Sequence, residues 1–325
     1  YSQNSTKFKQ VIDSLSQEKI DIWNNFIDSR KQSKLTEKVT RSSITYSYAN
    51  RLERYALLRG SNWSLSDTKE YFKYRGNLDL NDKDLILFEP YINYLMNYFN
   101  KSALDSSQVY FYQKDDTEFN IKKLVLIDTE IKDENLKNIL SRATAIEELL
   151  NFKNHNLHER FIGYYSYINS SQTYYDEILR LHNDINKMQI GNKLPEVDLM
   201  NFNQNIISSD DVFINKKTVI YFWSQTQMNH YRRTIRRINE LKKIYPQYRY
   251  VGICIQPYND LVNQAQTILN VVIDDQFSFT NFEKSSKDWV LTYLNKAIII
   301  DQKSKIIDGF GNLFSSNIEQ SLRRY

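Results

Sequence analysis

The chain has 325 residues, of which 41% are apolar and 14% aromatic, and it carries a net charge of +4. This length and apolar content can fill two separate cores, so we expect two globular domains. The small net charge and the lack of a long basic stripe with interleaved aromatic residues argue against nucleic-acid binding, and no apolar run approaches the roughly 20 residues that span a bilayer.

The first 188 residues show helical periodicity. Apolar residues recur at intervals of three and four, which places them on one face of an α-helix, and the longest such stripe runs from Lys132 to Phe152. Pro90 fits the first turn of a helix over 91–100, and Gly76 fits the end of a short capped helix. We therefore predict a mostly α-helical N-terminal domain over residues 1–188. Further helical stripes lie at Phe8–Leu15, Ile20–Ile27, Ile44–Tyr55 and Gln172–Met188.

One segment of this half departs from the helical pattern. The run Val109–Tyr112 is followed, after a charged loop, by Phe119–Ile121. Short runs of aromatic and β-branched residues suit strands as well as helix ends. The pair fits either a small β-hairpin or a helix boundary.

Three histidines of the first half raise the question of a metal site. His155 and His158 are three residues apart, and His182 follows further along the chain. Imidazole is a common zinc ligand, but a site needs further ligands that converge on the ion. A solvated pair at 155 and 158 is the simpler interpretation, so we expect no metal. The sequence also has no phosphate-binding glycine loop and no nucleotide fingerprint, so we expect no cofactor.

Residues 189–325 alternate short apolar runs with amphipathic helical stretches. Such alternation predicts strands and helices in a layered α/β domain. One helix is expected from Asn229 to Tyr245, where Pro246 stops it, and a polar helical stretch is expected over Asn259–Asn270. The buried stripe of the first of these helices consists of Tyr231, Ile235, Ile238, Leu241 and Tyr245.

Residues 218–230 read Thr-Val-Ile-Tyr-Phe-Trp-Ser-Gln-Thr-Gln-Met-Asn-His. An apolar strand ends here in Phe-Trp, at Trp223, and a helix follows. The stretch resembles the active-site strand and turn of the thioredoxin-like family, in which a Cys-x-x-Cys pair opens the helix. The two cysteine positions of that motif fall on Gln227 and His230, with Met228 and Asn229 between them.

The resemblance covers roughly residues 190–325 and is closest to the TlpA/ResA-like branch of thiol-disulfide proteins. Residues 191–199 resemble the first segment of that branch, and 210–217 resemble the lead into its central strand. Ala297–Asp301 with Lys305–Gly309 resembles the closing β-hairpin, and Ser316–Arg324 resembles the last helix. The resemblance implies a thioredoxin-like domain over 189–325, a mixed sheet with flanking helices, and a place in the bacterial cell envelope, in the periplasm.

Three hallmark positions of the family are changed. Thiol-disulfide exchange needs a thiolate to attack and a second thiol to resolve the mixed disulfide, and neither Gln227 nor His230 supplies one. The cis-proline of the family falls on Asn295, where a cis bond costs roughly 2.5 to 4 kcal/mol. The resemblance therefore implies the scaffold without its chemistry, together with a remodelled substrate groove. The single cysteine, Cys254, lies inside an apolar run and is predicted to be a small buried side chain.

Four arginines crowd the helix after Trp223, at Arg232, Arg233, Arg236 and Arg237. Arginine pairs bidentately with carboxylates and phosphates. The row is either a solvated face with acidic neighbours such as Glu240, or a docking surface for an acidic protein or for lipid headgroups.

Three functions are compatible with the sequence. The leading hypothesis is a redox-inactive thioredoxin-like protein that is more a non-catalytic interaction or scaffold subunit of an envelope assembly than an enzyme. The alternative is a groove-based binder of a ligand or peptide, or an enzyme of non-thiol chemistry, with Trp223 and residues 228–230 lining the groove. The third is a thiol oxidoreductase acting through Cys254. The chain opens on Tyr1, so a leader or anchor ahead of it is compatible with the sequence, and membrane association is expected only through such an anchor or a partner.

Overall fold

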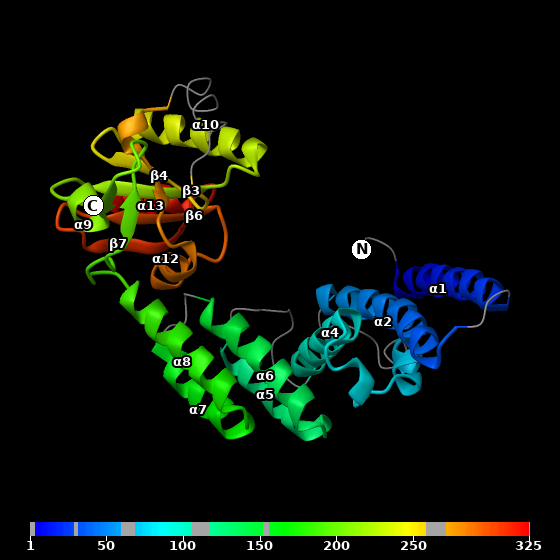
Figure 1. Cartoon of the computed structure of the whole chain (residues 1–325). Coiled ribbons are helices and arrows are strands. Elements are labelled where there is room, and N and C mark those ends of the chain that lie inside the picture. The colour runs from blue at the N-terminus through cyan, green and yellow to red at the C-terminus, as the bar shows by residue number, and fades with distance from the viewer. Residues whose placement is uncertain are drawn as a thin grey trace. The chain divides into compact units, whose positions relative to one another are not determined.

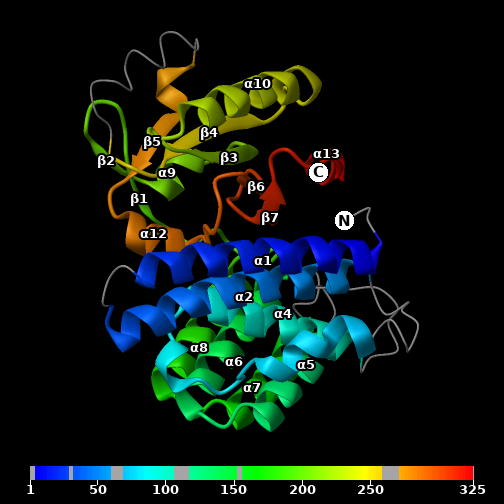
Figure 2. The same cartoon turned by 90° about the vertical axis from the view of Figure 1, so that its right-hand side faces the viewer.

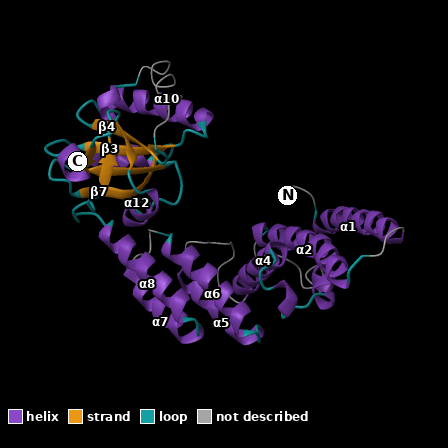
Figure 3. Ribbon diagram, in the orientation of Figure 1, coloured by secondary structure: helices purple, strands orange, loops and turns teal. Residues whose placement is uncertain are grey.

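The computed structural model describes residues 4–28, 32–59, 69–105, 117–151, 156–257 and 271–324. The chain divides into two compact units, Tyr1–Ile178 and Leu179–Tyr325 (Figure 1). The first unit is helical and the second holds the sheet (Figure 3). The division falls inside helix α8 (Gln172–Lys187), and the domain boundary after residue 188 stays a prediction.

The described part of the first unit is built from α-helices (Figure 2) and short 3-10 segments. Side-chain caps fix two helix starts: the Ser33 hydroxyl accepts from the backbone N–H of Thr36, and the Asp133 carboxylate accepts from that of Leu136. The elements are α1 (Ser5–Asp28), α2 (Lys34–Leu58), η1 (Phe72–Asn77), η2 (Lys83–Leu85), α4 (Glu89–Asp105), α5 (Thr117–Glu130), α6 (Glu134–Leu149) and α7 (His158–Ile168).

Most helical predictions for this unit are confirmed. The two apolar stripes between residues 8 and 27 form the single helix α1, and Pro90 is the second residue of α4. Gly76 lies inside η1, one residue before its end. Phe119–Ile121 lies in α5, so the hairpin interpretation is wrong for that segment. Its other half, Val109–Tyr112, lies outside the described residues.

The solvated position predicted for His158 is wrong. His158 is fully buried at the start of α7. It lies three and four residues before Phe161 and Ile162, which are also buried, so helical geometry puts the imidazole on the same inward face. Its predicted companion, His155, lies outside the described residues.

The described strands of the second unit form one seven-stranded mixed sheet in the order β2-β1-β5-β4-β3-β6-β7. Strands β3, β4 and β5 are parallel, whereas β6 is antiparallel to both β3 and β7. The hairpin β1–β2 is added at one edge, where β1 is antiparallel to β5. The strands are β1 (Asp198–Met200), β2 (Ile206–Ser208), β3 (Thr218–Trp223), β4 (Arg249–Cys254), β5 (Gln276–Phe279), β6 (Lys296–Ile300) and β7 (Ile306–Asn312).

The main elements follow the order that the sequence predicts. Strand β3, helix α10 (Met228–Ile244) and parallel strand β4 are followed by the antiparallel hairpin β6–β7 and by α13 (Asn317–Arg324). A mixed sheet with flanking helices is therefore confirmed for this unit. Three smaller helices complete it, α9 (Ser209–Phe213), η4 (Ile273–Asp275) and α12 (Phe282–Asp288). The helical stretch expected over Asn259–Asn270 lies outside the described residues.

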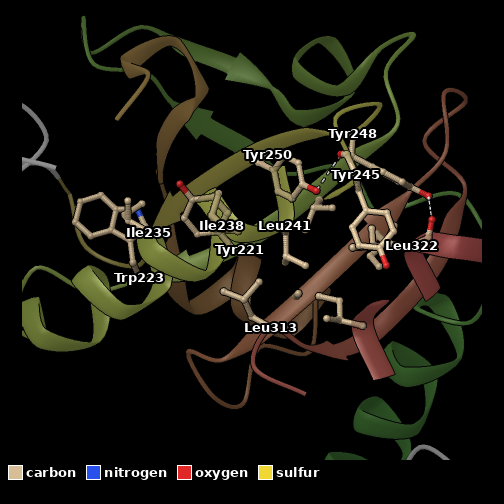
Figure 4. Packing of buried hydrophobic residues seen from close by; sticks show 14 of the residues in the cluster. Tyr221, Trp223, Ile235, Ile238, Leu241, Tyr245, Tyr248, Tyr250, Leu313 and Leu322 are labelled. Atoms are coloured by element: carbon tan, nitrogen blue, oxygen red, sulfur yellow. Dashed lines mark hydrogen bonds between the residues drawn. The ribbon is translucent and has the colours of Figure 1, made fainter. Parts of the chain in front are cut away.

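Helix α10 covers one face of the sheet. Its predicted apolar stripe is buried there, as are Leu313 and Leu322 from the C-terminal end of the chain (Figure 4). The opposite face is covered by Trp289, which follows α12 and packs against Phe222 of β3 with ring centroids 6.2 Å apart. Because both faces are covered, β3 is buried along its whole length. The end of β3 is thereby held rigidly where α10 begins.

Candidate functional site

The candidate site lies where β3 ends and α10 begins, at the position that the family resemblance indicates. Trp223 is the last residue of β3 and is fully buried. Its indole stacks on the ring of Tyr231, with centroids 4.1 Å apart and planes inclined by 17°. This contact joins the end of the strand to the first turns of the helix, so the segment between them has little freedom.

Gln227 and His230, the positions predicted to replace two cysteines, lie at the start of α10. Gln227 is the N-cap residue, but its side chain makes no capping hydrogen bond and is exposed. Asn229 is also exposed, whereas Met228 is half-buried and packs against the core under α10. His230 is half-buried in the same turn. The side chains of this turn therefore offer amide, thioether and imidazole groups and no thiol.

His230 and Asn295 meet directly, although 65 residues separate them in the sequence. The imidazole Nε2–H donates to the side-chain oxygen Oδ1 of Asn295 over 2.8 Å. The other ring nitrogen, Nδ1, is buried without a hydrogen-bond partner in the described structure. His230 and Asn295, two of the site positions predicted from the sequence, are thus joined through their side chains.

The backbone at Asn295 is ordinary. The described residues contain no cis peptide bond. The Asn295 carbonyl accepts a hydrogen bond from the backbone N–H of Leu313 over 2.8 Å. Residue 295 is therefore anchored to the segment after β7, and its side chain is held toward α10.

A network of amides and hydroxyls covers the ends of β3 and β4 beside this turn. Gln256 donates from Nε2 to the Ser224 hydroxyl over 2.9 Å, and its Oε1 accepts from the backbone N–H of Gln225 over 3.0 Å. The Ser224 hydroxyl also lies 2.9 Å from that of Thr226. These bonds fix the loop that leads from β3 into α10.

Cys254 lies beneath that network. It is fully buried at the end of β4, with Nε2 of Gln225 3.6 Å from its sulfur and Oε1 of Gln256 3.8 Å from it. Burial raises the pKa of the Cys254 thiol, against a smaller lowering by the hydrogen bonds from those two residues. A reactive thiol needs exposure and a lowered pKa, so the structure gives no support to chemistry through Cys254.

The four arginines of α10 differ in their surroundings. Arg237 is mostly buried and internally paired: it donates to Glu319 over 2.9 Å, lies 3.5 Å from Glu240, and donates to the carbonyl of Leu313. Arg232, Arg233 and Arg236 are exposed. The prediction of acidic neighbours for the row therefore holds at Arg237, which is tied to α13.

Sequence reasoning missed three residues around the site. Phe314 follows β7 and packs edge-on against His230, with ring centroids 6.2 Å apart. Gln256 follows β4 and organises the loop network. Lys296 follows Asn295 and is buried in β6, where its Nζ donates to the carbonyls of Trp289 and Val290. Of the three, only Lys296 has a signal in the sequence that could have identified it: a charged residue directly precedes the unbroken apolar run 297–300.

The described residues contain neither a cluster of metal ligands nor a membrane-spanning helix. Among them, no three His, Cys, Asp or Glu side chains converge as metal ligands. His182, the third histidine considered as a metal ligand, is buried and shares a hydrogen bond of 3.2 Å with Asn186. Within the described ranges, none of the helices combines the length and the apolar character needed to cross a bilayer.

No protein-family model matches the chain, and no curated protein matches it. Solved structures similar to it include a provisionally assigned thiol-disulfide oxidoreductase from Bacteroides vulgatus, with 14% identity, coverage of 42% of this chain and 97% of the other, and a TM-score of 0.37. A thiol-disulfide oxidoreductase from Bacteroides fragilis has 20% identity, coverage of 39% and 98%, and a TM-score of 0.31.

A third similar structure is the exposed lipoprotein thioredoxin of Streptococcus pneumoniae, with 14% identity, coverage of 40% of this chain and 100% of the other, and a TM-score of 0.29. Each similarity covers less than half of this chain and nearly all of the other protein. Identities and scores at this level do not decide a family or an activity. The architecture of the second unit is established by its own strand order and pairing.

Proposed function

We propose that this protein is a redox-inactive thioredoxin-like protein that serves as a non-catalytic interaction subunit of a bacterial cell-envelope assembly. The observation that carries the proposal is the hydrogen bond between His230 and Asn295. It connects the position of the resolving cysteine with that of the cis-proline, which in a thioredoxin face each other across the substrate groove. Gln227 completes the change, because it supplies an amide where the attacking cysteine would stand.

The envelope location and the partner are further parts of this proposal. The similar solved structures include one named an exposed lipoprotein and others named thiol-disulfide oxidoreductases. Because the chain has one cysteine and that thiol is buried, the proposal assigns this domain protein binding in place of thiol-disulfide turnover.

Insulin reduction tests the absence of thiol chemistry. With dithiothreitol as reductant, we expect the protein to precipitate insulin no faster than a no-protein control, while an active thioredoxin does so rapidly. Reduction well above the control that persists in Cys254→Ser would overturn the proposal. For the interaction part, we expect affinity capture at native expression levels from envelope fractions to return a partner in fixed stoichiometry, and capture of background proteins alone would contradict it.

Restoring the thiols tests the scaffold itself. Positions 227 and 230 are the N-cap and the third residue of α10, where a helix N-terminus stabilises a thiolate. We expect the double variant Gln227→Cys, His230→Cys to form a disulfide and to reduce insulin, and Asn295→Pro to raise that activity further. Two exposed cysteines without the Cys-x-x-Cys spacing should not reduce insulin efficiently. The matched control is therefore the double variant Gln227→Cys, Asn229→Cys. Equal activity of the two double variants would contradict a retained thioredoxin-like site.

A second candidate function is ligand binding at the same place, and one observation favours it. The Nδ1 atom of His230 is buried without a hydrogen-bond partner in the described structure, and a buried polar atom is costly to leave unpaired. A ligand that forms a hydrogen bond with Nδ1 would remove this cost. We expect His230→Phe to abolish such binding and to leave assembly with a protein partner intact, and the opposite pattern would exclude groove binding.

A further inference from the structure

Three guanidinium groups of α10 form an exposed cationic surface, which we call the arginine surface: Arg232, Arg233 and Arg236. Within the described part of the chain, no ion pair joins any of them to a carboxylate, whereas Arg237 on the same helix is paired with Glu240 and Glu319. Like charges four residues apart on a helix repel each other. The arginine surface therefore carries an electrostatic cost that an anionic partner would remove.

The arginine surface continues into the candidate site. Arg233 lies over the ring of Phe314, with its Cζ 5.3 Å from the ring centroid. The same ring packs against His230. Phe314 thus positions Arg233 beside the first turn of α10, which reduces the entropy that its guanidinium loses on binding. Asn229 is also exposed, and it lies three and four residues before Arg232 and Arg233, which puts it next to them on the helix surface.

The apolar side of α10 indicates which kind of anion fits. A helix that binds a membrane surface inserts its apolar face into the headgroup region. In α10 that face is buried against the sheet, with Ile238 and Leu241 at most 2% exposed (Figure 4). In the middle of the helix, only polar and charged side chains are therefore accessible to a binding partner. Such a surface fits protein carboxylates, which arginine binds bidentately, better than a lipid bilayer.

We propose that the arginine surface docks an acidic segment of a partner protein, through bidentate contacts from Arg232, Arg233 and Arg236 to aspartate or glutamate side chains. The proposal rests on the interaction role proposed above and names the chemistry of the partner. Arg237 takes no part, because its guanidinium ties α10 to α13.

The test uses the full-length protein and a fluorescein-labelled peptide of alternating glutamate and serine, followed by fluorescence anisotropy. We expect the triple variant Arg232→Gln, Arg233→Gln, Arg236→Gln to raise the dissociation constant by about tenfold or more, which corresponds to about 1.4 kcal/mol. A peptide with glutamine in place of glutamate should not bind. Raising the salt concentration should weaken the wild-type complex.

The matched control removes three exposed charges of the same unit elsewhere, in Lys216→Gln, Lys284→Gln, Lys303→Gln. We expect it to bind the peptide as the wild type does. An equal loss in both triple variants would show a nonspecific effect of net charge and would overturn the proposal. So would a wild type that fails to bind the peptide, or one that binds only vesicles containing phosphatidylglycerol. If the protein binds no peptide and also reduces no insulin, the docking role of the arginine surface is contradicted, whereas the redox-inactive function proposed above is retained.

Discussion

Glu53 has no exposed surface, yet it carries an acidic group inside the helical unit. Its carboxylate accepts from Arg75 Nη2 over 2.6 Å, from Arg75 Nε over 2.7 Å and from the Tyr74 hydroxyl over 2.7 Å. The guanidinium is also stacked 3.9 Å above the ring of Phe72. The charge of Arg75 is therefore compensated inside the unit, and η1 is fixed to α2 through it.

Removing that carboxylate should destabilise the helical unit strongly. In Glu53→Gln the shape is kept but the buried guanidinium loses its counter-charge, so we expect a loss of about 3 kcal/mol in the free energy of unfolding. Urea denaturation monitored by circular dichroism measures it. The control is Glu37→Gln, which breaks the exposed pair with Arg41 and should cost less than about 0.5 kcal/mol. Equal effects of the two substitutions would contradict the buried role.

Lys296 predicts how the stability of the sheet unit depends on pH. Burial lowers the pKa of its amino group to about 7, although the Asp308 carboxylate acts in the opposite direction. In the unfolded chain the same group keeps its proton up to a pKa of about 10.4. Between these values the unfolded state binds more protons than the folded state, so stability rises with pH. Below pH 7 both states are protonated and the cost of burying the charge is complete.

The variant Lys296→Met isolates this effect, because every other titrating group is the same in both proteins. We expect the unfolding free energy of the wild type to increase, relative to that of the variant, when the pH is raised from 6 to 9. Denaturant titrations at the two pH values measure the difference. Parallel pH profiles of the two proteins would show that Lys296 stays charged in the fold.

At the scale of the element, Gly252 is the point where β4 passes two buried polar side chains. Tyr221 of β3 accepts from Gln276 of β5 over 2.9 Å, above the glycine between them. A Cβ built on Gly252 would lie 2.7 Å from the Tyr221 hydroxyl and would also meet Oε1 of Gln276. A methyl group there must displace one member of the pair.

We expect Gly252→Ala to destabilise the sheet unit by about 1–3 kcal/mol, because overpacking forces side chains out of their preferred rotamers. The same substitution in α7 is the control. Gly163 is exposed, and a Cβ on it would meet nothing within 4 Å, so Gly163→Ala should stabilise the helical unit by about 0.5–1 kcal/mol. Thermal unfolding measures both, and a neutral Gly252→Ala would contradict the close packing.

Long periodic elements could be predicted from the sequence, and short ones could not. The apolar stripe of α10 and the apolar run of β3 can be recognised in the sequence because many residues follow one pattern. The strands β2 (Ile206–Ser208) and β5 (Gln276–Phe279) have three and four residues, too few to show a period. Their strand state comes from pairing with β1 and β4, which is information that no local pattern carries.

The candidate site likewise has a part that the sequence could predict and a part that it could not. The scaffold positions Gln227 and His230 could be found because they lie next to a recognisable strand. The hydrogen bond from His230 to Asn295 could not, since it joins the first turn of α10 to the turn before β6, and only the folded sheet brings these two segments together. Burial of His158 was missed for a different reason: the neighbouring Phe161 and Ile162 set the inward face of α7, and histidine follows the face on which it lies.

At the scale of the whole molecule, each unit has hydrophobic clusters of its own. In the helical unit, one cluster includes Tyr91, Leu95 and Phe99 of α4. In the sheet unit, another joins Trp223 to Ile238 and Leu322. Separate cores of this kind predict separate cooperative unfolding of the two units.

Calorimetry of the full chain should therefore show two transitions, and the substitutions argued above assign them. Glu53→Gln should lower the midpoint of one transition and leave the other in place, whereas Gly252→Ala should do the reverse. For domains of this size a loss of 1 kcal/mol lowers the midpoint by about 2–4 °C, so each shift can be resolved. A single transition that both substitutions lower would mean that the two units unfold as one, and the protein would then present its arginine surface only as part of an intact whole.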